Sequence, residues 1–144
     1  RKIVPLLAPL ALGLPAIPAA RAEVPTPSFA CSAARTEVER TVCTTPELAR
    51  EDAVMARLYA AARRGARDDG QSGQGAAQLA WLRERAGCEK FNSSAYTSRA
   101  ECLGGQYRTR NIALATAALF TDREFALEQL RRLDPKDAPL VQHW

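Results

Sequence analysis

Residues that favour β-strands are scarce in this sequence. After residue 22 it contains only six Val and Ile residues, against 22 Ala and 15 Arg. Val and Ile favour strands, whereas Ala and Arg favour helices. No segment alternates apolar and polar residues with the period of two that a half-buried strand shows. The composition therefore argues against a sheet and predicts an all-α fold.

Histidine is almost absent, and phosphate-binding glycine motifs are missing. The single His143 lies next to the last residue, so we expect no nucleophile paired with a His and no His-rich metal site. No Cys-x-x-Cys pair is present either, and the acidic residues are accounted for by helix starts and solvated helix faces. We therefore predict that the chain is not an enzyme and uses no metal and no cofactor.

A strong charge of one sign is also missing once the N-terminus is set aside. The chain of 144 residues carries a net charge of +4. Residues 1–22 contribute Arg1, Lys2 and Arg21 and no acid. The remainder holds 17 Lys and Arg against 16 Asp and Glu, a net charge of +1. The basic isoelectric point is therefore no sign of nucleic-acid binding, and we expect no nucleic-acid partner.

One long apolar run is present, at residues 3–18. A short basic stretch precedes it, and Ala20-Arg21-Ala22 follows, with small residues where a signal peptidase requires them. The run contains four prolines and is shorter than the roughly 20 apolar residues of a membrane span. We predict a signal peptide over residues 1–22, cleavage before Glu23, and a periplasmic or extracellular protein without an integral membrane span. Lipidation of Cys31 is the alternative, although Ser28 replaces the Leu that a lipobox prefers.

All four cysteines follow the predicted cleavage site. An exported chain reaches an oxidising compartment, where disulfides persist. Four cysteines allow three pairings, and the spacings favour Cys31–Cys43 and Cys88–Cys102. Each bridge would close a short loop, which contributes about 3 kcal/mol in the chain-entropy description.

Local signals at helix ends divide the rest of the chain. Three segments fit the capping box, in which a Ser or Thr side chain accepts from a free backbone N–H and a Glu reaches back. They are Thr36–Glu39, Ser98–Glu101 and Thr121–Glu124, and Pro46 marks a further start. We expect an extended lead-in over 23–30, a loop over 65–75 and a loose tail after Pro135. Helices are predicted over about 36–43, 46–65, 76–87, 98–120 and 122–133.

Apolar residues at helical spacing predict which faces are buried. The sequence thus predicts a small antiparallel helical bundle stapled by two disulfides. The expected inner faces carry Leu48, Met55, Leu58, Tyr59 and Ala62; then Leu79, Leu82 and Ala86 with Trp81 beside them; then Cys102 or Leu103, Tyr107, Leu114 and Ala118.

Over residues 31–115 the chain resembles the lysozyme inhibitor LprI-like domain family of small exported bacterial proteins. The resemblance implies an LprI-like helical domain over 31–120, followed by a C-terminal helix and a loose tail over 121–144. The matching positions are Cys31-Ser32-Ala33-Ala34-Arg35-Thr36, Val38, Glu39, Val42, Cys43, Pro46-Glu47-Leu48-Ala49, Asp52, Leu58-Tyr59, Trp81-Leu82-Arg83, Arg85, Cys88, Cys102-Leu103, Tyr107, Arg110 and Leu114.

This resemblance implies inhibition of lysozyme, with a muramidase as protein partner. Two departures accompany it: Glu51 stands where the family usually has an apolar residue, and the helix after residue 122 lies outside the match. The founding member is a lipoprotein, but the poor lipobox here means that anchoring does not carry over. An exported envelope interaction module or immunity-type protein whose partner is not lysozyme is the alternative, and the oligomeric state stays open.

Each residue carried over from the family also has a purely structural interpretation. Trp81, Tyr59 and Tyr107 fit a core as well as a binding surface. Charged motif residues could stabilise helix ends instead of contacting a partner; these are Glu39, Asp52, Arg85 and Arg110. For partner binding, the best protrusion in the sequence is the 63–75 segment with Arg63, Arg64 and Arg67, although a solvated helix end also explains these arginines.

Overall fold

The computed structural model describes residues 24–65, 73–91 and 94–136, and within them it confirms the all-α fold. Five α-helices and two short 3₁₀ helices pack together, and the described part of the chain contains no strand. The predicted signal peptide, Arg67 and most of the predicted tail lie outside the described residues. The elements are η1 (Cys31–Ala33), α1 (Glu37–Thr44), α2 (Pro46–Gly65), α3 (Gln74–Ala86), η2 (Gly87–Lys90), α4 (Arg99–Ala118) and α5 (Arg123–Leu133).

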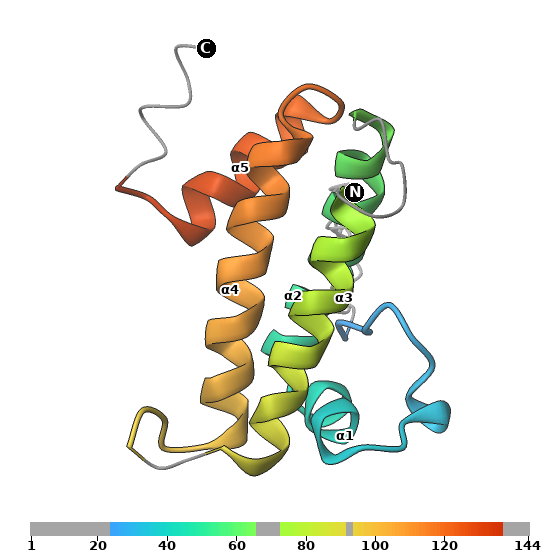
Figure 1. The fold of residues 1–144 in the computed structure, drawn as a ribbon, viewed down its shortest axis with the longest axis vertical. Coiled ribbons are helices and arrows are strands. Elements are labelled where there is room, and N and C mark those ends of the chain that lie inside the picture. The colour runs from blue at the N-terminus through green and yellow to red at the C-terminus, as the bar shows by residue number, and fades with distance from the viewer. Residues whose placement is uncertain (1–23, 66–72, 92–93, 137–144) are drawn as a thin grey trace, which may run out of the picture.

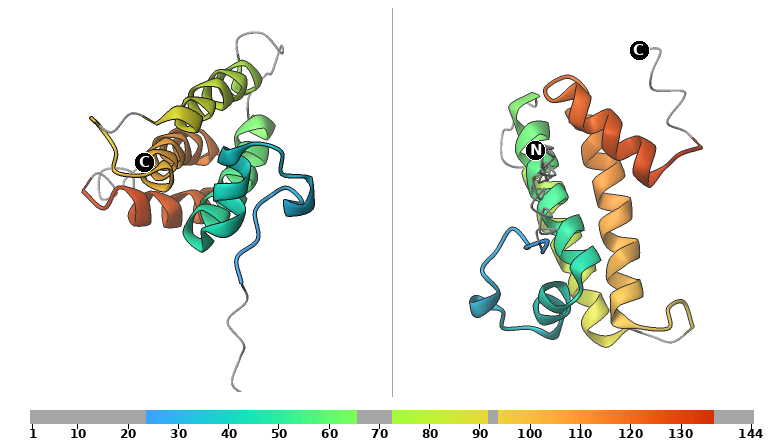
Figure 2. Two further views of the ribbon diagram at one scale, coloured as in Figure 1. Left: turned by 90° about the horizontal axis from the view of Figure 1, so that it is seen from below. Right: turned by 180° about the vertical axis from the view of Figure 1, so that it is seen from behind.

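Helices α2, α3 and α4 form the long axis of the molecule. The helices α2 and α4 run in the same direction and α3 runs opposite to both (Figure 1). The helix α5 folds back along α4 after a tight turn, and α1 crosses the opposite end of the bundle (Figure 2). The principal interface joins α2 to α4, two helices that are not neighbours in sequence.

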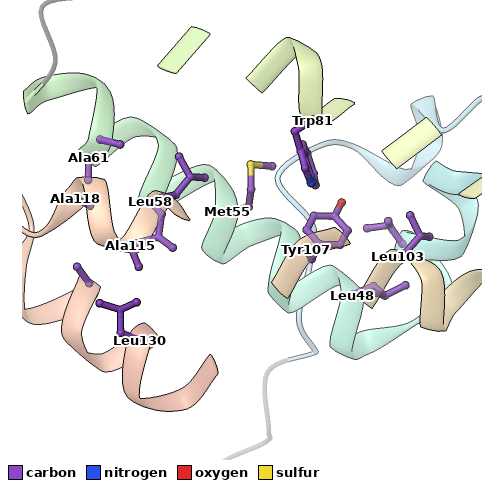
Figure 3. Close-up of a cluster of buried hydrophobic side chains, with 14 of the residues drawn as sticks. Leu48, Met55, Leu58, Ala61, Trp81, Leu103, Tyr107, Ala115, Ala118 and Leu130 are labelled. Atoms are coloured by element: carbon purple, nitrogen blue, oxygen red, sulfur yellow. The ribbon is translucent and has the colours of Figure 1, made fainter. Parts of the chain in front are cut away.

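Small side chains fill the interface between α2 and α4 near the turn into α5. Ala61, Ala115 and Ala118 are completely buried there, and Leu58 packs beside them (Figure 3). Since interhelical distance depends on the size of the side chains at the contact, alanines at facing positions let the helices approach closely. Leu130 of α5 closes this part of the core (Figure 3).

Both disulfides form as the spacings predict. Cys31 and Cys43 join η1 to α1, and Cys88 and Cys102 join η2 to α4. The second bridge is buried in the core, whereas Cys31 is exposed. Two disulfides indicate an oxidising, extracytoplasmic environment for this chain.

The predicted capping boxes have three different outcomes. Thr36 and Glu39 form both hydrogen bonds of the box at α1. Ser98 accepts from the backbone N–H of Glu101, but the Glu101 carboxylate turns to Thr97 instead. The box predicted at Thr121 is wrong: α5 begins at Arg123, and the Thr121 hydroxyl donates to a carbonyl of α2. Because the Thr121 hydroxyl is bound to α2, it does not cap α5.

The predicted inner face of α3 is wrong for two of its residues, whereas Leu82 packs against the core as predicted. Leu79 is 57% exposed and Ala86 is exposed, whereas Gln78 and Trp81 are buried. The helix is rotated so that Trp81 enters the core with polar side chains on either side of it. This rotation is stable because the polar side chains form hydrogen bonds: Gln78 with α2 and α4, and Arg85 with α4.

Candidate functional site

A buried carboxylate lies at the centre of the bundle. Asp52 follows Leu48 by one helical turn on the inner face of α2, and it is 1% exposed. Its Oδ1 accepts a hydrogen bond of 2.7 Å from the Tyr107 hydroxyl of α4. Its Oδ2 accepts from the backbone N–H and the hydroxyl of Ser28, at 2.7 and 2.6 Å. The carboxylate thereby ties the N-terminal lead-in to α2 and α4.

A cation from α3 completes this cluster. Arg85 Nη1 donates to the Tyr107 hydroxyl at 2.9 Å and lies 3.8 Å from Asp52 Oδ1. Its guanidinium lies 5.2 Å from the centre of the Trp81 ring, a cation–π distance. Because a buried charge is stable only when it is paired and hydrogen-bonded, Asp52 and Arg85 need each other here.

The aromatic rings of Trp81 and Tyr107 pack edge to face, with centroids 5.2 Å apart (Figure 3). The Trp81 indole N–H donates to the Gln106 carbonyl at 3.1 Å, so the polar atom of this buried ring has a partner. Burial raises the pKa of the Tyr107 phenol above its usual value; the cation of Arg85 opposes this shift and the Asp52 carboxylate adds to it. The phenol therefore stays protonated and continues to donate to Asp52 at any physiological pH.

Arg110 belongs to a neighbouring polar pair. Its Nε donates to Gln78 Oε1 at 2.9 Å, and the Gln78 amide donates in turn to the Met55 sulfur at 3.1 Å. Burial lowers the pKa of Arg110, and Tyr59 opposes this shift. Tyr59 itself is half-buried at the edge of the core. Arg110 thus fixes α3 to α4 from the inside of the bundle.

Glu39 lies at the edge of the cluster. Its carboxylate accepts from the backbone N–H groups of Arg35 and Thr36, and these two bonds lower the pKa of Glu39. A small cleft of about 120 Å³ separates this end of α1 from Arg85 and Leu82 of α3. Glu39 therefore works as a helix cap.

Of the three arginines proposed for partner binding, the two that the structure describes lie away from this cluster. Arg63 and Arg64 are exposed in the last turn of α2. The Arg63 guanidinium lies 5.7 Å from the centre of the Tyr59 ring. Arg67 falls outside the described residues. The structure thus brings Asp52, Trp81, Arg85 and Tyr107 together, and places Arg63 and Arg64 elsewhere.

Sequence reasoning missed a second polar network, which is centred on Glu51. The Glu51 carboxylate accepts from Asn111 Nδ2 of α4 at 2.9 Å and pairs with Arg132 of α5. Glu51 therefore connects α2 to both α4 and α5, and α5 supplies the cation for the acid. Asn111, a polar residue between Tyr107 and Leu114 on the inner face of α4, is the sequence feature that could have predicted this network. No residue near Arg132 in the sequence indicates its pairing with Glu51.

A groove runs beside the lead-in. It has a volume of about 590 Å³, and Arg50 and Arg57 line it together with Val54 and Phe125. The Arg57 guanidinium covers the Phe125 ring at 3.6 Å. None of the residues that line the groove belongs to the Asp52 cluster.

The polar groups of the cluster are connected by hydrogen bonds across the bundle. Both Asp52 oxygens are engaged, and among the described residues no group of three or more His, Cys, Asp or Glu side chains could hold a metal. No helix in the described ranges has the length and apolar character to cross a membrane. The chain matches no protein family, no curated protein and no solved structure in the comparisons made.

Proposed function

We propose that the chain is an exported inhibitor of lysozyme-type muramidases that binds the enzyme and blocks its active-site cleft. The resemblance over residues 31–115 and the export signal predicted for residues 1–22 support this function. Two disulfides on an all-α scaffold suit a small protein that must persist outside the cytoplasm. We propose a periplasmic or secreted location, after cleavage before Glu23.

The observation that carries the proposal is the convergence of the family-motif side chains. Asp52, Trp81, Arg85 and Tyr107 are spread over more than fifty residues of sequence, yet they meet as one connected buried cluster. Their contact supports the interpretation that these residues form one structural motif, and we propose that the partner-binding surface lies outside the cluster.

Blocking a muramidase requires complementarity to its cleft. Such a cleft holds two carboxyl groups, one of which an apolar pocket keeps protonated as the general acid. A guanidinium inserted there would pair with the ionised carboxylate and exclude the sugar. We assign this role to the end of α2 and the segment after it, with Arg63, Arg64 and Arg67. The chain acts in this proposal as a binding protein and not as an enzyme.

One observation favours the rival function. The net charge of +1 after residue 22 provides little long-range attraction toward cationic lysozymes. An envelope interaction module or immunity-type protein has no need of such attraction.

Lysozyme inhibition by the chain from Glu23 onward tests the proposal. We expect inhibition of a lysozyme in a cell-wall lysis assay, and about tenfold weaker inhibition by the Arg63→Ala/Arg64→Ala/Arg67→Ala variant, because it removes the three cations assigned to the cleft. The control is Arg83→Ala, which removes an exposed arginine in the last turn of α3 and leaves the end of α2 unchanged. Full inhibition by the triple variant would reject the arginines. No inhibition of any lysozyme, with capture of a different envelope protein, would favour the rival function.

A further inference from the structure

A single aromatic ring protrudes from the turn between α4 and α5. Phe120 is 95% exposed, more than the other large exposed hydrophobic residues of the described chain, Val24 at 74% and Leu79 at 57%. Nothing in the fold requires an aromatic residue there, since the ring contributes almost nothing to the core. An apolar side chain of this size gains most of its interaction energy when a partner covers it.

The turn that carries Phe120 is tightly attached to α2. Thr121 Oγ1 donates to the Ala61 carbonyl at 2.7 Å, and the Asp122 carboxylate accepts from Arg57 at 3.2 Å. A side chain at Gly65 would come within 2.9 Å of the Thr121 methyl group, so the turn rests directly on the end of α2. The ring is therefore presented on a rigid support, which reduces the entropy lost on binding.

The same end of the molecule carries exposed cations. Arg63 and Arg64 close α2 immediately before Gly65, and Arg123 opens α5 three residues after Phe120. Asp122, in the same turn, pairs with Arg57, and Glu124 follows Arg123 in the sequence. The turn and the end of α2 lie together at one end of the bundle (Figure 1). An apolar ring beside two chain segments with arginines is the composition of a protein-binding hot spot.

We infer that Phe120 is the apolar anchor of the inhibitory surface and enters the sugar-binding cleft of the muramidase, with Arg64 and Arg123 beside it. This inference rests on the proposed function and names the part of the chain that performs it. The cleft of a muramidase combines an apolar wall next to the protonated acid with an ionised carboxylate. The Phe120 ring would pack on the apolar wall of the cleft, and the guanidinium groups of the chain would pair with the ionised carboxylate.

The test compares Phe120→Ser with Leu79→Ser in the chain from Glu23 onward, against purified animal, bacterial and phage lysozymes. Both residues are exposed, so neither change removes core packing, and circular dichroism checks the fold. For a lysozyme that the parent inhibits, we expect Phe120→Ser to weaken binding about 10- to 100-fold, as loss of a hot-spot residue does, and Leu79→Ser to change it less than about twofold. A chito-oligosaccharide that fills the cleft should displace the parent chain.

The outcomes separate this inference from the proposed function. If the parent inhibits a lysozyme and Phe120→Ser inhibits equally well, or if the oligosaccharide fails to compete, the assignment of Phe120 is wrong while the inhibitor function stands. If the parent neither binds nor inhibits any of the lysozymes, the proposed function is overturned and the assignment falls with it.

Discussion

At the scale of single residues, hydrogen bonds to one buried carboxylate connect distant parts of the chain. Asp52 accepts from Ser28 of the lead-in and from Tyr107 of α4, and Tyr107 accepts in turn from Arg85 of α3. Each donor compensates part of the large cost of burying a charge. The loss of a single donor should therefore weaken the whole fold rather than one helix.

Tyr107→Phe tests this dependence. The change keeps the ring that packs on Trp81 but removes the hydroxyl, so Asp52 and Arg85 each lose a partner. Hydrogen bonds to charged groups contribute about 1.5–3 kcal/mol, and we expect the free energy of unfolding to fall by about 2 kcal/mol in urea titrations. The matched control is Tyr59→Phe at the edge of the core, expected to change it by less than about 0.5 kcal/mol. Equal effects of the two changes would contradict the importance of the cluster.

At the scale of elements, side chains close in sequence and one distant carboxylate together stabilise the start of α1. The α1 helix begins with a complete capping box, and Glu89 of η2 adds two hydrogen bonds to the backbone N–H groups of Glu37 and Val38. A free helix N-terminus favours negative charge, because its N–H groups have no acceptor within the helix. The start of α1 is therefore an acid-sensitive part of the fold.

Glu39→Gln tests the acid sensitivity of α1. Backbone hydrogen bonds lower the pKa of Glu39 in the folded chain, so its charge stabilises the fold above the ordinary carboxyl pKa, and this stabilisation is lost as the pH falls through the lowered value. Gln can still form the box but carries no charge. We expect the parent to be more stable than the variant near neutral pH and the difference to shrink as the pH falls below the ordinary carboxyl pKa, measured by urea unfolding.

The control for this experiment is Glu128→Gln, which changes an exposed acid on the outer side of α5. It should show little difference from the parent at either pH. A difference between parent and Glu39→Gln that persists unchanged in acid would contradict the role assigned to the charge.

At the scale of the whole molecule, each disulfide joins a short 3₁₀ helix to an α-helix. The two bridges span similar lengths of chain, with sequence separations of 12 and 14 residues. Chain entropy therefore predicts similar stabilisation, about 3 kcal/mol for each. Their surroundings differ, since Cys88 and Cys102 are packed inside the core and Cys31 is exposed.

Removing each bridge separately tests this difference. We expect Cys88→Ala/Cys102→Ala to lower the free energy of unfolding by more than about 3 kcal/mol, because the core also loses packed sulfur atoms. Cys31→Ala/Cys43→Ala should cost about 3 kcal/mol or less. Denaturant titration of both double variants under the same buffer measures the order. A larger loss of unfolding free energy in Cys31→Ala/Cys43→Ala than in Cys88→Ala/Cys102→Ala would contradict this prediction.

The sequence by itself determined the helical class, the two local disulfides and the starts of α1 and α2. These features depend on intrinsic propensity and on side chains within a few positions of each other, which are visible in one chain segment. Tertiary structure decided the rotation of α3, the start of α5 and the pairing of Glu51 with Arg132. It also attached the turn that carries Phe120 to the end of α2 through Thr121, because only the packing of α2 against α4 determines which distant groups meet.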